Sequence, residues 1–202
     1  MIFESILIIG FAIILDLVVG DPRNKYHPTA WIGNFISNLV PLFKNENIHL
    51  EKFGGILIVL ISTAVVGGLL LVLSLKLDSI IANELLSAIV IIVVCAILLK
   101  TTIAIRGMEK HALAVADAIE NDDIDEARAN LAMITKRKTK DLDKNHVLSG
   151  VLESISENTV DGVTGPLFYF ALFGLPGAFV YRVINTIDSM ICLLYTSPSP
   201  RD

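Results

Sequence analysis

The amino-acid sequence predicts an all-α, polytopic integral membrane protein with helical segments on the cytoplasmic side. Hydrophobic residues make up 53% of the 202 residues and charged residues only 18%, below the roughly 25% of an ordinary soluble domain. The apolar residues also form long runs, which are typical of segments that cross a bilayer. The net charge of −5 argues against a general nucleic-acid-binding protein. The two cysteines have no spacing typical of a disulfide framework or a zinc site.

Three apolar runs predict membrane helices. The first, residues 5–19, lacks the positive flank of a secretory signal peptide, so we expect an uncleaved helix that contains one acid, Asp16. Residues 54–75 carry no charge, and a helix that rises about 1.5 Å per residue crosses the hydrocarbon core over this length. Residues 85–99 are also uncharged and follow after a short connection. We therefore expect the second and third helices to form an antiparallel hairpin.

The polar part of the chain that follows predicts two soluble helices, over residues 102–120 and about 124–135. The second begins at Asp123, three residues before Glu126, a spacing that resembles a capping box. A last apolar stretch, residues 163–180, contains two prolines and several glycines. It predicts either a kinked span or a re-entrant segment enclosed by protein.

Basic residues predict the topology, because they gather in two segments. Residues 20–53 carry four Lys or Arg, and residues 100–144 carry nine. Two predicted crossings separate the segments, so both lie on the same side of the membrane. The positive-inside rule places that side in the cytoplasm of a multi-pass cell-membrane protein, with the N-terminus outside.

The first group of candidate site residues lies at the end of the first helix. A carboxylate such as Asp16 is costly inside a membrane helix, so it is a candidate functional residue; the alternative is that it snorkels or caps a neighbour. After the helix-ending turn, Asp21, Arg23, His27 and Trp31 follow closely. Together they favour a ligand-facing loop, although singly they also fit a turn residue, an interfacial histidine and a membrane anchor.

The second group is an acidic row before the last apolar stretch. On a helix, Glu153 and Glu157 share one face and Asp161 extends it. Like charges in such a row need a cation opposite them. Carboxylate and amide oxygens suit Mg²⁺, which also bridges to phosphates. The alternative is a solvated acidic face.

Two further polar clusters interrupt apolar sequence. Arg106, Glu109 and His111 begin the cytoplasmic region, and Asn185 and Asp188 lie near the end of the chain, just after Arg182. The sequence contains no GxxxxGK[ST] loop, so any use of ATP does not follow the P-loop pattern.

These motifs together resemble the CobD/CbiB family of cobalamin biosynthesis. The resemblance rests on ordered segments that run along nearly the whole chain up to Met190. They are DLVVGDP (residues 16–22) with HP and WIG, RGMEKHA (106–112), EAR (126–128) with LAMI, ESISENTVDGV (153–163) with PLFY, and INTIDSM (184–190).

The resemblance implies an adenosylcobinamide-phosphate synthase, a membrane carbon–nitrogen ligase. Such an enzyme consumes ATP with Mg²⁺ and joins (R)-1-aminopropan-2-ol, or its O-phosphate, to adenosylcobyric acid. It implies catalytic roles for Glu153, Glu157 and Asp161, with Mg²⁺ on Glu157 and Asp161. The implied substrate-binding residues are Asp16, Asp21, Arg23, His27, Trp31, Arg106, His111, Asn158, Asn185 and Asp188. The implied partners are the corrinoid, the amine and the lipid bilayer; an oligomer or other cobalamin-pathway membrane proteins are compatible with it.

The chain also departs from the family pattern. Lys138 stands where the family often has an acid, and Ser149 and Gly150 stand where an arginine–alanine pair is common. The ending LLYTSPSPRD resembles translated sequencing-adaptor sequence. We therefore expect an incomplete family domain over residues 1–190 and an artefactual tail over 191–202. The alternatives are a non-enzymatic sensor or transport-type relative, linked to β-lactamase induction, and an inactive fragment.

Overall fold

The computed structural model describes residues 2–20, 24–80, 83–135 and 138–192. Within these ranges the chain is helical and has no strand, which confirms the all-α prediction. Four helical stretches are long and apolar enough to cross a membrane: Ile2–Val19, Ile48–Leu77, Glu84–Glu120 and Lys144–Met190. The helices are α1 (Ile2–Val19), α2 (Pro28–Phe43), α3 (Ile48–Ile80), α4 (Glu84–Lys100), α5 (Ile105–Glu120), α6 (Ile124–Leu131), α7 (Lys144–Thr159) and α8 (Gly165–Ile187).

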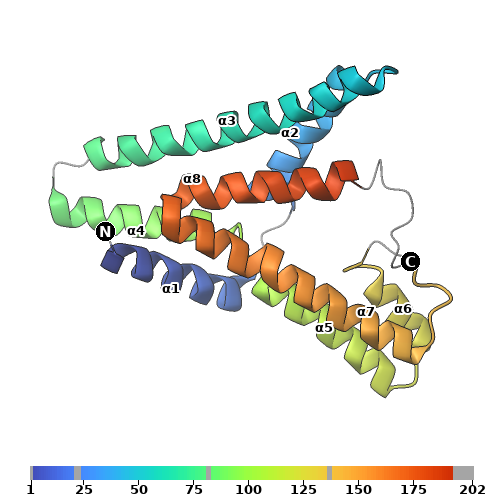
Figure 1. Ribbon diagram of the computed structural model, residues 1–202. Coiled ribbons are helices and arrows are strands. Elements are labelled where there is room, and N and C mark those ends of the chain that lie inside the picture. The colour runs from blue at the N-terminus through green and yellow to red at the C-terminus, as the bar shows by residue number, and fades with distance from the viewer. Residues whose placement is uncertain (1, 21–23, 81–82, 136–137, 193–202) are drawn as a thin grey trace.

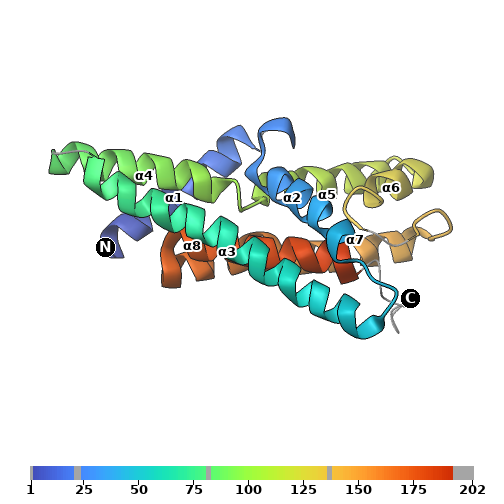
Figure 2. The ribbon, with the colours of Figure 1, turned by 90° about the horizontal axis from the view of Figure 1, so that it is seen from above.

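The long helices pack side by side in the membrane part of the molecule (Figure 1). Helix α1 packs mainly on α4, and α3 mainly on α8. Helices α3 and α4 run in opposite directions, as the predicted hairpin requires, and Figure 2 shows the same antiparallel course from above. The buried residues Ala12, Ile58, Leu99 and Val183 belong to one apolar core that these helices share.

A smaller bundle of α5, α6 and α7 has a separate core, which includes Val115, Leu131 and Val147. Helix α6 starts as predicted, because Asp123 Oδ1 accepts a hydrogen bond from the Glu126 backbone N–H at 2.9 Å. It ends at Leu131 rather than near residue 135, because the backbone closes into a turn there. Helix α5 begins at Ile105, three residues later than predicted.

The sequence predicts a helix that holds the acidic row but does not predict where this helix, α7, begins or ends. It begins after Asp143, whose Oδ1 accepts a hydrogen bond from the His146 backbone N–H at 2.9 Å. This N–H holds the pKa of Asp143 below its usual value. Helix α2 was not predicted. Its signal was present at His27 and Pro28, since Nδ1 of His27 accepts from the Thr29 N–H and Pro28 occupies the first turn.

Helix α8 is a hairpin rather than one straight helix. The chain reverses at Gly174, where φ is 66° and ψ is −157°, a conformation that only glycine adopts readily. The rings of Tyr169 and Tyr181, one from each arm, stack with centroids 5.1 Å apart. A Cβ at Gly177 would overlap the Tyr169 backbone oxygen, and a Cβ at Gly165 would overlap the Tyr181 ring. The two arms are therefore in direct contact.

The hairpin agrees with the re-entrant alternative for the last apolar stretch. In Figures 1 and 2 its turn stops short of the end of α3 and the start of α4. The first arm, from Gly165 to Gly174, measures roughly 15 Å at the α-helical rise, about half of the hydrocarbon thickness. Protein covers one side of the reversal, since α3 packs along α8 and Leu175 and Gly177, directly after Gly174, are buried, so the backbone there does not face lipid alone.

The hairpin gives a first prediction. Gly177→Ala places a methyl group against backbone, which cannot move aside as a flexible side chain does, so we expect a loss of about 1–3 kcal/mol in stability. The measurement is the unfolding midpoint of the purified protein in detergent. Gly10→Ala is the matched control, because a Cβ at Gly10 meets nothing within 4 Å. Equal midpoints for the two variants would contradict the tight hairpin.

Candidate functional site

Asp16 is fully buried in α1 and caps a different helix. Its Oδ2 accepts hydrogen bonds from the backbone N–H groups of Ile105 and Arg106, at 2.9 and 3.0 Å. These groups begin α5, where unpaired N–H groups and the helix dipole favour a negative charge. The structure therefore gives Asp16 the geometry of the capping alternative.

Lys100 and Arg106 complete this contact between α1 and α5, which we call the joint. The Nζ of Lys100, which is 6% exposed, lies 3.6 Å from Asp16 Oδ1 and donates to the Gly20 carbonyl. The Arg106 guanidinium donates to the carbonyls of Leu17, at 2.9 Å, and of Val18. Arg106 thus caps the C-terminal end of α1. A positive charge at this end also complements the helix dipole.

Sequence reasoning missed the part that Lys100 plays in this joint. It interpreted Lys100 only as one of the basic residues that report topology. The available signal was a single lysine directly after a long uncharged run, in a chain that also has a single acid within an apolar helix. Buried charges are usually paired, so these two residues were candidates for one another.

The start of α2 meets the end of α4. The Thr29 hydroxyl donates to the Thr101 carbonyl at 3.1 Å, across 72 residues of sequence. This contact joins a residue of the first basic segment to a residue of the second; their side of the membrane stays a prediction. Trp31 is 56% exposed, and its Nε1 donates to the Lys25 carbonyl at 2.9 Å. His27 caps α2, while Asp21 and Arg23 lie outside the described residues.

Asp161 and Asn185, which come from separate motifs, are in direct contact. The Asn185 Nδ2 donates to Asp161 Oδ2 at 2.9 Å, and the Tyr181 hydroxyl lies 3.4 Å from Oδ1. The Arg182 Nη1 donates to the Asp161 backbone carbonyl at 3.3 Å. The reversal at Gly174 makes these contacts, because it returns the second arm of α8 beside the start of the first. Tyr181 and Arg182 were not among the predicted site residues.

A π-helical turn carries Asp161. It spans Val160–Thr164, between α7 and α8, and turns of this kind occur frequently at functional sites. The Gly162 carbonyl accepts a hydrogen bond from the Ala104 N–H at 3.1 Å, so the turn is also tied to the start of α5. The acidic row is interrupted here: Glu153 and Glu157 stay exposed on α7, whereas Asp161 is half-buried and faces α8.

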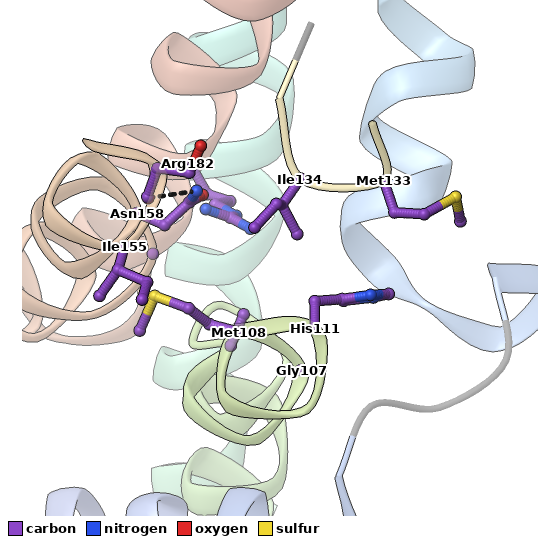
Figure 3. A pocket seen from close by; sticks show the side chains of 11 residues that line it. Gly107, Met108, His111, Met133, Ile134, Ile155, Asn158 and Arg182 are labelled. Carbon is purple, nitrogen blue, oxygen red and sulfur yellow. Dashed lines mark hydrogen bonds between the residues drawn. The ribbon is translucent and has the colours of Figure 1, made fainter. Parts of the chain in front are cut away.

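A cavity of about 290 Å³ opens beside this turn (Figure 3). Asn158 and Arg182 lie together on one side of it, and His111 and Met108 of α5 line the opposite side. The remaining lining residues are Ala104, Gly107, Met133, Ile134, Ser154, Ile155 and Gly162. The cavity combines a guanidinium, an amide and an imidazole with apolar walls, an arrangement that suits a small anionic ligand.

The structure brings together only part of the predicted site. His111 and Asn158 line the cavity, and Asp161 and Asn185 adjoin it through Arg182. Glu153, Glu157 and Asp188 are exposed and do not line it. Within the described ranges, no group of three or more His, Cys, Asp or Glu side chains is placed to hold a metal ion.

Comparison with known proteins shows the family. A sequence profile described as "CobD/Cbib protein" matches residues 9–197. The chain belongs to the CobD/CbiB family. A probable cobalamin biosynthesis protein CobD of Methanocaldococcus jannaschii is 39% identical over 188 residues, which cover 92% of this chain and 59% of the relative. The CobD of Dehalococcoides mccartyi, named a cobalamin biosynthesis protein, is 35% identical over 192 residues, or 93% of this chain and 59% of the relative.

A probable CobD of Thermoplasma volcanium is 36% identical over 185 residues, which cover 92% of the chain and 58% of that relative. The chain thus spans less than two thirds of the length of these CobD relatives. The CobD/CbiB match extends past the expected boundary at Met190 into residues 191–197, most of which lie outside the described residues. No solved structure matches the chain.

The buried joint gives a second prediction. Asp16→Asn and Lys100→Met each remove one charge of this buried pair and leave the opposite charge buried, and such losses cost about 3–5 kcal/mol. The double variant should lose less than the sum of the two single losses, because it removes both charges. Unfolding in detergent measures all three losses.

The matched control is the exposed pair of Lys144 and Asp122, whose atoms lie 3.4 Å apart. Lys144→Met and Asp122→Asn should each change the stability by about 1 kcal/mol or less. Additive losses for Asp16 and Lys100 would contradict the direct coupling of the two charges.

Proposed function

We propose that this chain forms the membrane-embedded part of an ATP-dependent carbon–nitrogen ligase in cobalamin biosynthesis. The reaction joins (R)-1-aminopropan-2-ol, or its O-phosphate, to a carboxylate of adenosylcobyric acid and yields adenosylcobinamide or its phosphate. Membership of the CobD/CbiB family supports the pathway. The observation that carries the assignment of the site is the meeting of Asp161, Asn185 and Arg182 next to the cavity.

The reaction requires an activated carboxylate and a base. Transfer of the γ-phosphoryl group of ATP to the substrate carboxylate gives an acyl phosphate and ADP. Attack by the amine on the carbonyl carbon then forms the amide and releases phosphate. The amine loses its proton to a general base, and a carboxylate near the cavity is suited to that role. We favour Asp161, because its Oδ2 accepts from Asn185 and its backbone carbonyl accepts from Arg182, which lines the cavity. Glu153 and Glu157 on α7 are the further candidates.

The cavity limits which substrate it can enclose. At about 290 Å³ it fits a small molecule and not a whole corrinoid. Arg182 and His111 are suited to a phosphate group on the amine or on the nucleotide. We therefore place the small substrate in the cavity and the corrinoid outside it. The loop with Asp21, Arg23, His27 and Trp31 is a further candidate for substrate binding.

Mg²⁺ is the cofactor that this chemistry implies. It takes hard oxygen ligands and is often held by one or two carboxylates together with substrate phosphates and water. Glu157 fits this role, because its exposed side chain pairs with no other residue in the described part of the chain. Asp161 fits as a second ligand, since each carboxylate oxygen can accept more than one partner. The ion would offset the charge of the phosphate groups.

A ligation assay in isolated membranes tests the proposal. Membranes that contain a full-length CobD/CbiB-family protein are compared with membranes that contain the 202-residue chain. Adenosylcobyric acid, aminopropanol phosphate, ATP and Mg²⁺ are added, and mass spectrometry detects the adduct. Formation of the adduct by the full-length protein supports the proposed ligase activity. Its presence or absence with the 202-residue chain decides whether this polypeptide is an inactive fragment. Product from neither favours the non-enzymatic sensor or transport-type alternative.

The proposed site gives a third prediction. In the active full-length protein, Asp161→Asn should lower product formation about a hundredfold or more, the usual range for loss of an acid–base group. Glu157→Gln should lower it as well and raise the Mg²⁺ concentration needed for half-maximal rate. Glu120→Gln, at the exposed end of α5, is the matched control. Unchanged turnover in Asp161→Asn, with equal membrane insertion, would refute the assigned site.

A further inference from the structure

A second cavity lies between the end of α2 and the start of α3, away from the proposed site. Its volume is about 400 Å³. We call it the α2–α3 groove. One face of α3 forms its floor, with Ile48, Lys52, Gly55 and Ile58 on successive turns. Val40, Phe43 and Lys44 at the end of α2 form its wall. None of these residues belongs to the proposed site.

The groove is polar at one end and apolar at the other. Gly55 and Ile58 lie within the uncharged part of α3, and Ile58 is only 4% exposed. Lys44 and Lys52 lie outside this uncharged part. They are next to the connection between α2 and α3, which forms one end of the molecule in Figure 1. The groove therefore passes from the hydrocarbon core to the depth at which lipid headgroups lie.

The mouth of the groove carries a net positive charge. Lys44 and Lys52 are exposed, and neither forms an ion pair within the described part of the chain. One acid, Glu51, is half-buried beside them. Large apolar side chains are exposed on the first turns of α3, among them Ile48 at 61% and Phe53 at 57%, as on a lipid-facing surface.

We propose that the α2–α3 groove binds one anionic phospholipid. The acyl chain lies against Val40, Gly55 and Ile58, and the phosphate lies between Lys44 and Lys52. An apolar slot that ends at two cationic side chains matches the two ends of such a lipid in both polarity and charge. The proposal does not depend on the proposed ligase activity, since it uses a different part of the molecule.

Gly55 makes a sharp test possible, because a Cβ at this position meets nothing within 4 Å. Gly55→Leu therefore fills the groove without a clash at its first atom. Gly68→Leu is the matched control: Gly68 lies on the same helix, is equally unobstructed, and does not line the groove. The full chain is purified in detergent, mixed with phosphatidylglycerol or phosphatidylcholine, and examined by native mass spectrometry.

We expect the unmodified chain and Gly68→Leu to retain one phosphatidylglycerol in preference to phosphatidylcholine. Gly55→Leu should lose most of this bound lipid. Equal retention of the two lipids, or undiminished retention by Gly55→Leu, would overturn the proposal. A dimer that Gly55→Leu dissociates, without bound lipid, would also overturn it and assign the groove to a second copy of the chain.

Lysine variants provide a second measurement that leaves the shape of the groove intact. Each of Lys44→Gln and Lys52→Gln should lower the preference for phosphatidylglycerol about fivefold, the usual contribution of one basic residue near an anionic lipid. Lys110→Gln, an exposed change on α5, should leave the preference unchanged. A fall of similar size in Lys110→Gln would show a general charge effect and would contradict a defined site.

Discussion

The buried carboxylate of Asp16 is the constraint on which the arrangement of the helices depends. A charge with no solvent exposure is stable only when fixed partners compensate it. Here they come from the first N–H groups of α5 and from Lys100 at the end of α4. These partners fix where α5 begins and how the end of α1 meets it. Asp16 thus helps to fix the position of the α5, α6 and α7 bundle relative to α1 and α4.

The same requirement for satisfied polar groups explains the shape of α8. A reversal inside a bilayer exposes backbone groups, so it needs protein around it. Glycines provide close contact on both sides: Gly177 lies against the opposite arm, and a Cβ at Gly67 of α3 would lie only 2.9 Å from Val180. Because the arms are in contact, Asn185 and Arg182 return to Asp161. The hairpin is therefore what assembles the candidate site.

The sequence predicted features that depend on local composition and missed those that depend on contacts between distant residues. The uncharged runs predicted α3 and α4 because a charge is costly in hydrocarbon. The meeting of Asp161 with Asn185 could not be predicted, because it depends on the reversal at Gly174. The acidic row was predicted as one continuous face, but the π turn separates Asp161 from Glu153 and Glu157. The roles of Asp21 and Arg23 stay predictions.

The joint at Asp16 and the hairpin at Gly174 position residues on opposite sides of the same cavity. Helix α5 supplies Gly107, Met108 and His111, and its first turn is held by Asp16. The opposite side holds Asn158 and Arg182, whose place depends on the π turn and the second arm of α8. The Ala104–Gly162 hydrogen bond links the two sides. A displacement of Asp16 or of Gly174 should therefore change the distance across the cavity, although neither residue belongs to its lining.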